Sequence, residues 1–136
     1  MDLFFNSGDI MADLMTEFNK IWQNLMSDLV EKASISRLKF ATKEANLTEF
    51  QTIYALMQCT PDLSQSNCSL CLREYVAEYQ KCCNGKQGGV VQGPNCISRW
   101  DLYPFYTITA TPDAPPPSPL PPPTTSTITK GMFTPS

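Results

Sequence analysis

The sequence has 136 residues and contains no histidine. Without an imidazole, Ser-His-Asp and Cys-His catalysis, histidine-ligated zinc and most general-base mechanisms are excluded. A glycine-rich phosphate loop and a paired-acid motif are also missing from the sequence. We therefore predict that the chain is not an enzyme and holds no cofactor and no metal.

Charge and hydropathy exclude two further classes of protein. Ten lysine and arginine residues stand against thirteen aspartate and glutamate residues, so the formal net charge is -3. The basic residues form no run, which argues against nucleic acid as a partner. No stretch of about 18 apolar residues occurs, so the sequence predicts no segment that spans a bilayer. We expect contact with a membrane only through a longer parent receptor.

Residues 1–6 lack the marks of a signal peptide, which are a basic start, a sustained apolar segment and a small-residue cleavage site. Six cysteines nevertheless occur in this short chain, and such a content is typical of small secreted domains. We therefore expect the chain to be an internal piece of a longer extracellular protein.

Hydrophobic spacing predicts a helix over residues 9–33 and two strands after it. The apolar positions of the helix recur in steps of three, four and seven, which places them on one broad stripe. Residues 38–42 alternate apolar and polar side chains, and residues 50–58 are rich in β-forming residues. The stripe of the helix consists of Ile10, Leu14, Phe18, Ile21, Leu25, Met26 and Leu29.

A second helix is predicted over residues 65–80, with Ser64 or Ser66 as its cap. Two further strand candidates, residues 86–92 and 96–106, are joined by the turn sequence Gly93-Pro94-Asn95. The whole pattern predicts an α+β fold in which two helices pack on an antiparallel sheet.

The composition changes near residue 109, so we divide the chain into a folded domain at 1–108 and a Pro/Ser/Thr-rich segment at 109–136. Proline fixes φ and lacks an amide donor, so neither helix nor sheet continues through such a segment. We expect a disordered, extended linker or stalk. A ligand for an SH3-type domain is the alternative interpretation.

The cysteines follow a C-x8-C-x2-C pattern at Cys59, Cys68 and Cys71, and three more follow at Cys82, Cys83 and Cys96. Thiolates at such spacing bind zinc in some domains, and in others they form disulfides. Six cysteines allow fifteen pairings, so the count alone selects none. The position of Cys68 and Cys71 on an apolar helix face favours disulfides, because zinc ligands usually sit on tight turns.

The cysteine motif and its flanks resemble the Gnk2-homologous (DUF26, stress-antifungal) family, in particular the second domain copy of plant cysteine-rich receptor-like kinases and related secretory proteins. The resemblance implies the same two-helix fold and the pairs Cys59–Cys68 and Cys71–Cys96. The partner of the third family bridge is absent, so Cys82 and Cys83 are left as a vicinal pair, as thiols or in bonds elsewhere. The segments that carry the resemblance are residues 40–42, 50–63, 68–71, 82–89 and 96–106.

The resemblance also implies a function, namely an extracellular binding module in plant defence or stress signalling, at the apoplastic face of the plasma membrane. Its expected partner is a carbohydrate of the mannose type or another extracellular protein domain. A free secreted antifungal or lectin-like protein is one alternative, and a cytosolic zinc-binding domain is an alternative of another class.

Two kinds of site residue follow. The mannose site of the family uses an Asn, an Arg and an acid. By spacing from Cys96, its Arg falls on Val90 and its acid on Asp101, while the Asn has no assigned match. Since valine donates no hydrogen bond, we expect weak mannose binding or none. Asn46-Leu47-Thr48 is a glycosylation sequon. Asn67-Cys68-Ser69 also fits that pattern, but its central cysteine is expected to be bridged.

Overall fold

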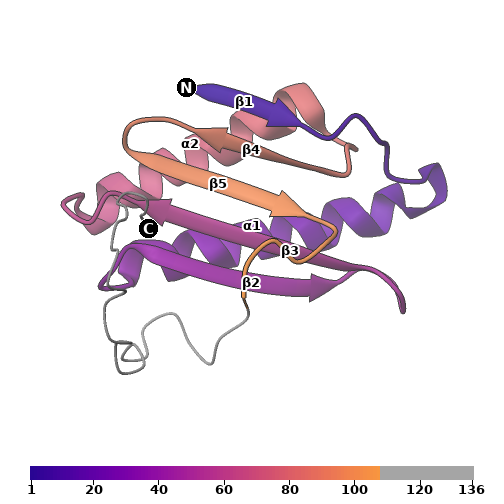
Figure 1. The fold of residues 1–136 in the computed structure, drawn as a ribbon, viewed down its shortest axis with the longest axis horizontal. Helices are drawn as coiled ribbons and strands as arrows, with labels where there is room; N and C mark the ends of the chain where they lie inside the picture. Colours follow the sequence, from indigo (N-terminus) through magenta and orange to yellow (C-terminus); the bar gives the residue numbers. More distant parts are fainter. Residues whose placement is uncertain (108–136) are drawn as a thin grey trace, which may run out of the picture.

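The computed structural model describes residues 1–107, and the predicted linker at 109–136 lies outside them. Two long helices and five strands make up the fold, with one short 3-10 turn before the first helix (Figure 1). In chain order these are β1 (Asp2–Phe5), η1 (Ala12–Leu14), α1 (Met15–Ile35), β2 (Phe40–Asn46), β3 (Thr52–Cys59), α2 (Gln65–Cys83), β4 (Gly88–Gln92) and β5 (Cys96–Asp101).

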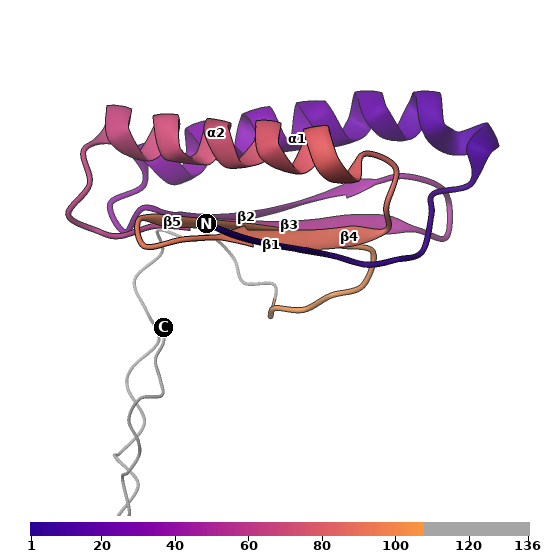
Figure 2. The same cartoon turned by 90° about the horizontal axis from the view of Figure 1, so that it is seen from above.

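The five strands form one sheet in the order β1-β4-β5-β3-β2, and every neighbouring pair is antiparallel. Both helices lie side by side on the same face of this sheet, and the opposite face carries no helix (Figure 2). The predicted α+β fold is thereby confirmed. The one-sided arrangement leaves an open face on which side chains of several strands meet.

The core lies between the helices and the covered face of the sheet. Along β3, the side chains of Ile53, Ala55 and Met57 are completely buried while their neighbours are half-buried. This alternation is the pattern of a strand with one face in the core. Trp100 of β5 is 2 % exposed and contacts three aromatic rings from the helices, namely Phe18, Trp22 and Tyr79.

Two disulfides attach α2 to the centre of the sheet. Cys59 bonds to Cys68 and Cys71 bonds to Cys96, which are the pairs that the family resemblance implies. Cys59 and Cys96 are cross-strand neighbours, and Cys68 and Cys71 lie one turn apart on the helix. The two bonds therefore run beside each other, which explains in physical terms why the two helix cysteines are three residues apart.

The structure joins the remaining two cysteines, the adjacent Cys82 and Cys83, to each other. This outcome is the first of the three that the sequence left open. All six cysteines lie within the described residues, and none of them is free. No thiolate is therefore left for zinc in residues 1–107, which argues against the cytosolic zinc-binding alternative.

The structure differs from the predicted secondary structure in three places. Residues 2–5 form a strand, β1, for which no strand was predicted. The first helix begins at Met15 rather than near residue 9, because residues 6–10 pair with residues 85–88 instead. The amide of Asn6 donates to the carbonyl of Gly88, and the amide of Ile10 donates to the carbonyl of Gly85. The last strand ends at Asp101 rather than at residue 106. Pro104, which has no amide donor, lies just beyond that end.

None of the helices in residues 1–107 combines the length and the apolar character needed to cross a membrane.

The cysteines differ in their accessibility, and this difference predicts their reactivity. Cys82 is exposed, whereas Cys83 is 1 % exposed although it is the next residue. After mild reduction, we expect iodoacetamide to modify Cys82 at least about tenfold faster than Cys83, because a buried sulfur reacts only after local opening. Mass spectrometry of the labelled peptides measures the two rates. Equal labelling of both residues would contradict the placement of Cys83 in the core.

Candidate ligand-binding face

The open face of the sheet brings together side chains from β1, β4 and β5. In the pairing register, Phe4 lies opposite Val90, and Val90 lies opposite Arg99. Side chains of a strand alternate between the two faces, so Arg99 and Asp101 share the open face while Trp100 between them enters the core. The family pattern places its arginine at the position of Val90. In this chain a guanidinium comes instead from Arg99, the residue opposite Val90 on the neighbouring strand.

A depression of about 370 Å³ lies over these three strands. Within it, Nη2 of Arg99 is 3.5 Å from Oδ2 of Asp101 and donates to the hydroxyl of Tyr103 at 3.3 Å. The depression therefore combines the guanidinium of Arg99, the carboxylate of Asp101 and aromatic side chains. Its lining consists of Phe4, Phe5, Asn6, Gly88, Gly89, Val90, Gln92, Ile97, Arg99, Asp101 and Tyr103.

Asp101 owes its position to a glycine on the neighbouring strand. Its pairing partner on β4 is Gly88, which has φ +150° and no side chain. A Cβ on Gly88 would lie 2.5 Å from Oδ1 of Asp101, so any other residue there would displace the carboxylate. Burial raises the pKa of Asp101 above its ordinary value, and the attraction and hydrogen bond of Arg99 oppose this effect in part.

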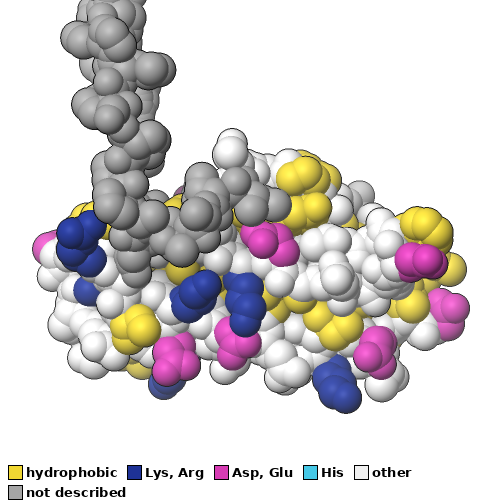
Figure 3. Space-filling model, turned by 90° about the horizontal axis from the view of Figure 1, so that it is seen from below, with side chains coloured by type: hydrophobic (Ala, Val, Ile, Leu, Met, Phe, Trp, Pro, Cys, Tyr) yellow, Lys and Arg dark blue, Asp and Glu magenta, His cyan; other side chains and the backbone are white. Residues whose placement is uncertain are grey.

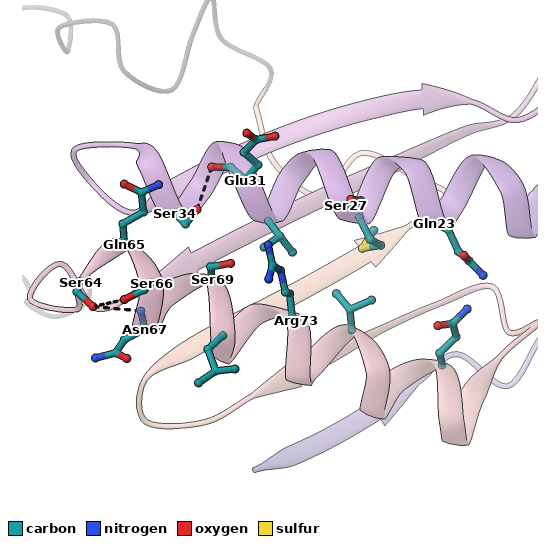
Figure 4. Close-up of a pocket in the computed structure, with 15 residues that line it drawn as sticks. Gln23, Ser27, Glu31, Ser34, Ser64, Gln65, Ser66, Asn67, Ser69 and Arg73 are labelled. Atoms are coloured by element: carbon teal, nitrogen blue, oxygen red, sulfur yellow. Dashed lines mark hydrogen bonds between the residues drawn. The ribbon is translucent and has the colours of Figure 1, made fainter.

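A second and larger depression, about 1160 Å³, lies between α1 and α2 on the other side of the molecule (Figure 4). Hydroxyl and amide side chains dominate its lining, and several of them already bond to their own helix. The hydroxyl of Ser34 donates to the carbonyl of Glu31, and that of Ser64 accepts from the amide of Asn67. Arg73 is the one basic residue in the lining. The groove differs from the open face in that no ion pair within the described residues joins its lining side chains to one another.

Charges elsewhere are mixed in sign. Along the β2 side of the molecule, lysine and arginine side chains alternate with acidic ones (Figure 3). Lys43 of β2, for example, lies 2.8 Å from the carboxylate of Asp28 on α1. This face therefore shows no single-sign patch of the kind that binds nucleic acid. Within residues 1–107, no group of three or more His, Cys, Asp or Glu residues is placed to hold a metal ion.

The structure separates the two kinds of site residue that the sequence predicted. Asp101 lies in the depression on the open face, whereas Asn46 lies exposed at the end of β2. Asn67 lies in the first turn of α2, next to the fully buried and bridged Cys68.

Asn6 and Arg99 are among the residues of the depression that the sequence did not predict as site residues. Asn6 was not assigned because residues 1–6 had no predicted element. Arg99 was not assigned either, because spacing from Cys96 places the family arginine at Val90. The turn at residues 93–95 fixes the pairing of β4 with β5 and so places Arg99 opposite Val90. Because that turn was recognised in the sequence, the position of Arg99 could have been predicted from it.

Comparison with known proteins identifies the relatives of this chain. The family described as salt stress response/antifungal matches residues 7–103. Cysteine-rich receptor-like protein kinase 14 of Arabidopsis thaliana is 48 % identical over 74 % of this chain and 16 % of the kinase. Cysteine-rich receptor-like protein kinase 34 of the same plant is 43 % identical over 88 % of this chain and 20 % of the kinase. The chain thus spans a fifth or less of the length of these two kinases.

Solved structures share the fold at lower identity. The tandem DUF26 ectodomain of the Arabidopsis thaliana cysteine-rich receptor-like protein PDLP5 superposes with a TM-score of 0.66 and 22 % identity. The match covers 77 % of this chain and 50 % of that ectodomain. The corresponding ectodomain of PDLP8 gives the same TM-score at 21 % identity.

The raised pKa of Asp101 predicts how its replacement affects stability. A carboxyl whose pKa is higher in the folded state stabilises the fold below its unfolded pKa, and this contribution is lost as pH rises through the folded pKa. Asp101→Asn keeps the neutral form at every pH. We therefore expect its free energy of unfolding, relative to the unmodified protein, to increase from pH 3 to pH 7 in urea titrations.

Asp28→Asn is the matched control, because it removes a carboxylate from an exposed ion pair. We expect it to change the free energy of unfolding by less than about 1 kcal/mol at pH 7. A fall in the relative stability of Asp101→Asn between pH 3 and pH 7 would show that Arg99 outweighs the effect of burial.

Proposed function

This chain belongs to the salt stress response/antifungal family, and from that premise we propose that it is an extracellular ligand-recognition module within the ectodomain of a receptor-type protein. The chain is a non-catalytic module, and the kinase for which its relatives are named lies outside the region that it matches. The observation that carries the proposal is the open sheet face, where Arg99, Asp101 and Tyr103 form a fixed polar group beside exposed aromatic side chains.

Three features support an extracellular location. Disulfides form and persist in oxidising compartments, and the fold depends on bonds between α2 and the sheet. The curated relatives are receptor-like kinases, and the solved structures with the same fold are ectodomains. We propose in addition that the module acts in plant defence or stress signalling at the apoplastic face of the plasma membrane, for which the family description and the plant relatives provide the support.

Carbohydrate recognition is a second candidate, favoured by one specific observation. Saccharide hydroxyls need donors and acceptors held in fixed positions, and the loss of a donor at Val90 predicted weak mannose binding. The structure supplies a guanidinium from the opposite residue, Arg99, next to the Asp101 carboxylate and in the same depression as Asn6. We therefore propose a saccharide as the ligand class. Another extracellular protein domain is the competing ligand.

The location has a direct test in the full-length protein. An epitope tag inserted next to this domain should react with antibody on intact, unpermeabilised cells. The sequon predicts an attached glycan as well, because Asn46 is exposed. Glycosidase treatment should reduce the apparent mass, and Asn46→Gln should abolish this change. Asn67→Gln is the matched control and should leave it intact. Antibody reaction only after permeabilisation would contradict the proposal.

The saccharide proposal predicts a loss of binding on one substitution. Arg99→Leu should weaken the binding of methyl α-mannoside, or of the best saccharide on a glycan array, by at least about tenfold, because a charged hydrogen bond is worth roughly 1.5–3 kcal/mol. Arg73→Leu is the matched control, since Arg73 lies in the groove between the helices. Calorimetric titration measures both. Equal affinity of Arg99→Leu and the unmodified protein would exclude this site.

A further inference from the structure

The chain that follows β5 crosses the open face of the sheet. We name residues 102–107 the strap. It leaves the end of β5, passes over β3 and reaches β2 on the side away from the helices (Figures 1 and 2). Its Tyr106 contacts β2 and β3 on this face, whereas the depression with Arg99 and Asp101 lies over β1, β4 and β5.

Tyr106 fastens the strap to the sheet. Its hydroxyl contacts the carboxylate of Glu44 and donates to the carbonyl of Lys43 at 3.3 Å, both on the edge strand β2. The ring of Tyr106 also packs edge-on against Tyr54 of β3, with 6.2 Å between the ring centroids. The hydrogen bond of the Tyr106 hydroxyl and the contact of its ring with Tyr54 together hold this end of the strap on the sheet.

Phe105, the residue before this anchor, lies against the guanidinium of Arg99. The Cζ atom of Arg99 is 4.0 Å from the centroid of the Phe105 ring. Asp101 and Tyr103 hold Nη2 of the same group at 3.5 and 3.3 Å. Arg99 is therefore fixed by the strap through its stacked ring and by its own strand through the carboxylate of Asp101.

We infer that the strap is a positioning element for Arg99, so that docking of the strap and binding of a ligand to the guanidinium reinforce each other. A guanidinium carries five N–H donors in one plane, and an aromatic ring stacked on it uses none of them. Donors remain for a ligand while the plane is held still. Because a free arginine loses much rotamer freedom on binding, an arginine that is already ordered binds with less entropic cost.

The coupling is reciprocal by thermodynamic necessity. If the docked strap strengthens ligand binding, a bound ligand stabilises the docked strap by the same factor. The strap is the last described segment before residue 108. Ligand binding on the sheet would therefore have a structural consequence at the C-terminal end of the domain. The ligand-binding half of this inference rests on the proposed saccharide recognition, whereas the link between strap and Arg99 does not.

The variant that tests the link is Tyr106→Phe, which removes the anchoring hydroxyl and keeps the ring. We expect faster hydrogen exchange at the amides of Leu102, Tyr103, Phe105 and Tyr106, and a loss of the ring-current shift that Phe105 imposes on the Arg99 Nε–H resonance. Arg99→Lys should speed exchange in the strap in the same way, because an ammonium does not stack as a planar group. The double variant should add little to either single change.

Tyr75→Phe is the matched control, since it removes a tyrosine hydroxyl from α2, on the covered side of the sheet. It should leave strap exchange and the Arg99 resonance unchanged. If Tyr106→Phe speeds strap exchange but the Arg99 resonance stays in place, or if strap exchange does not change at all, the inference is overturned.

Ligand binding is tested by measuring the affinity of the same proteins for methyl α-mannoside. Tyr106→Phe should bind it about fivefold more weakly, the lower end of the usual coupling between linked sites. Unchanged or tighter binding by this variant overturns the inference, and tighter binding would mean that the strap competes with the ligand. If the unmodified protein binds no saccharide, the saccharide proposal fails by itself, and the exchange and resonance measurements still decide whether the strap positions Arg99.

Discussion

The aromatic contacts of Trp100 determine the position of β5, on which the rest of the structure depends. Phe18, Trp22 and Tyr79 surround this ring, with 5.4 to 6.3 Å between the ring centroids. A slip of one residue along β5 would move Trp100 to the open face and would bury Arg99 and Asp101 among the helices. The cost of burying both charges beneath the helices is large, so the register is strongly determined. The same packing that stabilises the core therefore positions the candidate site.

The disulfides act on the same strand. Cys96 begins β5, and its bond to Cys71 lies next to the bond between Cys59 and Cys68. Each bond restricts the unfolded chain and typically raises the free energy of unfolding by about 2–4 kcal/mol. Since both bonds hold α2 to the β3–β5 pair, they keep the helix that carries Tyr79 against Trp100. The cysteines and the aromatic side chains thus fix one another's positions, and both sets lie between α2 and the sheet, away from the depression that holds Arg99.

Periodicity predicted the two helices and the strand at residues 38–42, whereas β-forming residues and the turn at residues 93–95 indicated the other three strands. β1 was missed because four residues give too short a pattern, and its pairing with β4 depends on contacts far away in the sequence. The candidate site was only partly predictable for the same reason. Spacing from Cys96 found Asp101, whereas Asn6 reaches the depression only through the pairing of β1. The strap was predicted as strand, since its aromatic residues resemble a strand in composition and only Pro104 indicates otherwise.

The ion pair of Arg99 and Asp101 lies in the depression on the open face, and one of its two charges is largely buried. Asp101 has a side chain that is 11 % exposed, and its pKa is raised although a guanidinium lies beside it. Burial therefore raises the pKa of the carboxylate more than the charge and hydrogen bond of Arg99 lower it. Gly88 has no side chain and therefore leaves space for the carboxylate of Asp101. Phe105 of the strap contacts the guanidinium of Arg99. Several elements thus contribute to holding the two charges in place, and this arrangement supports the proposal that the face recognises a ligand.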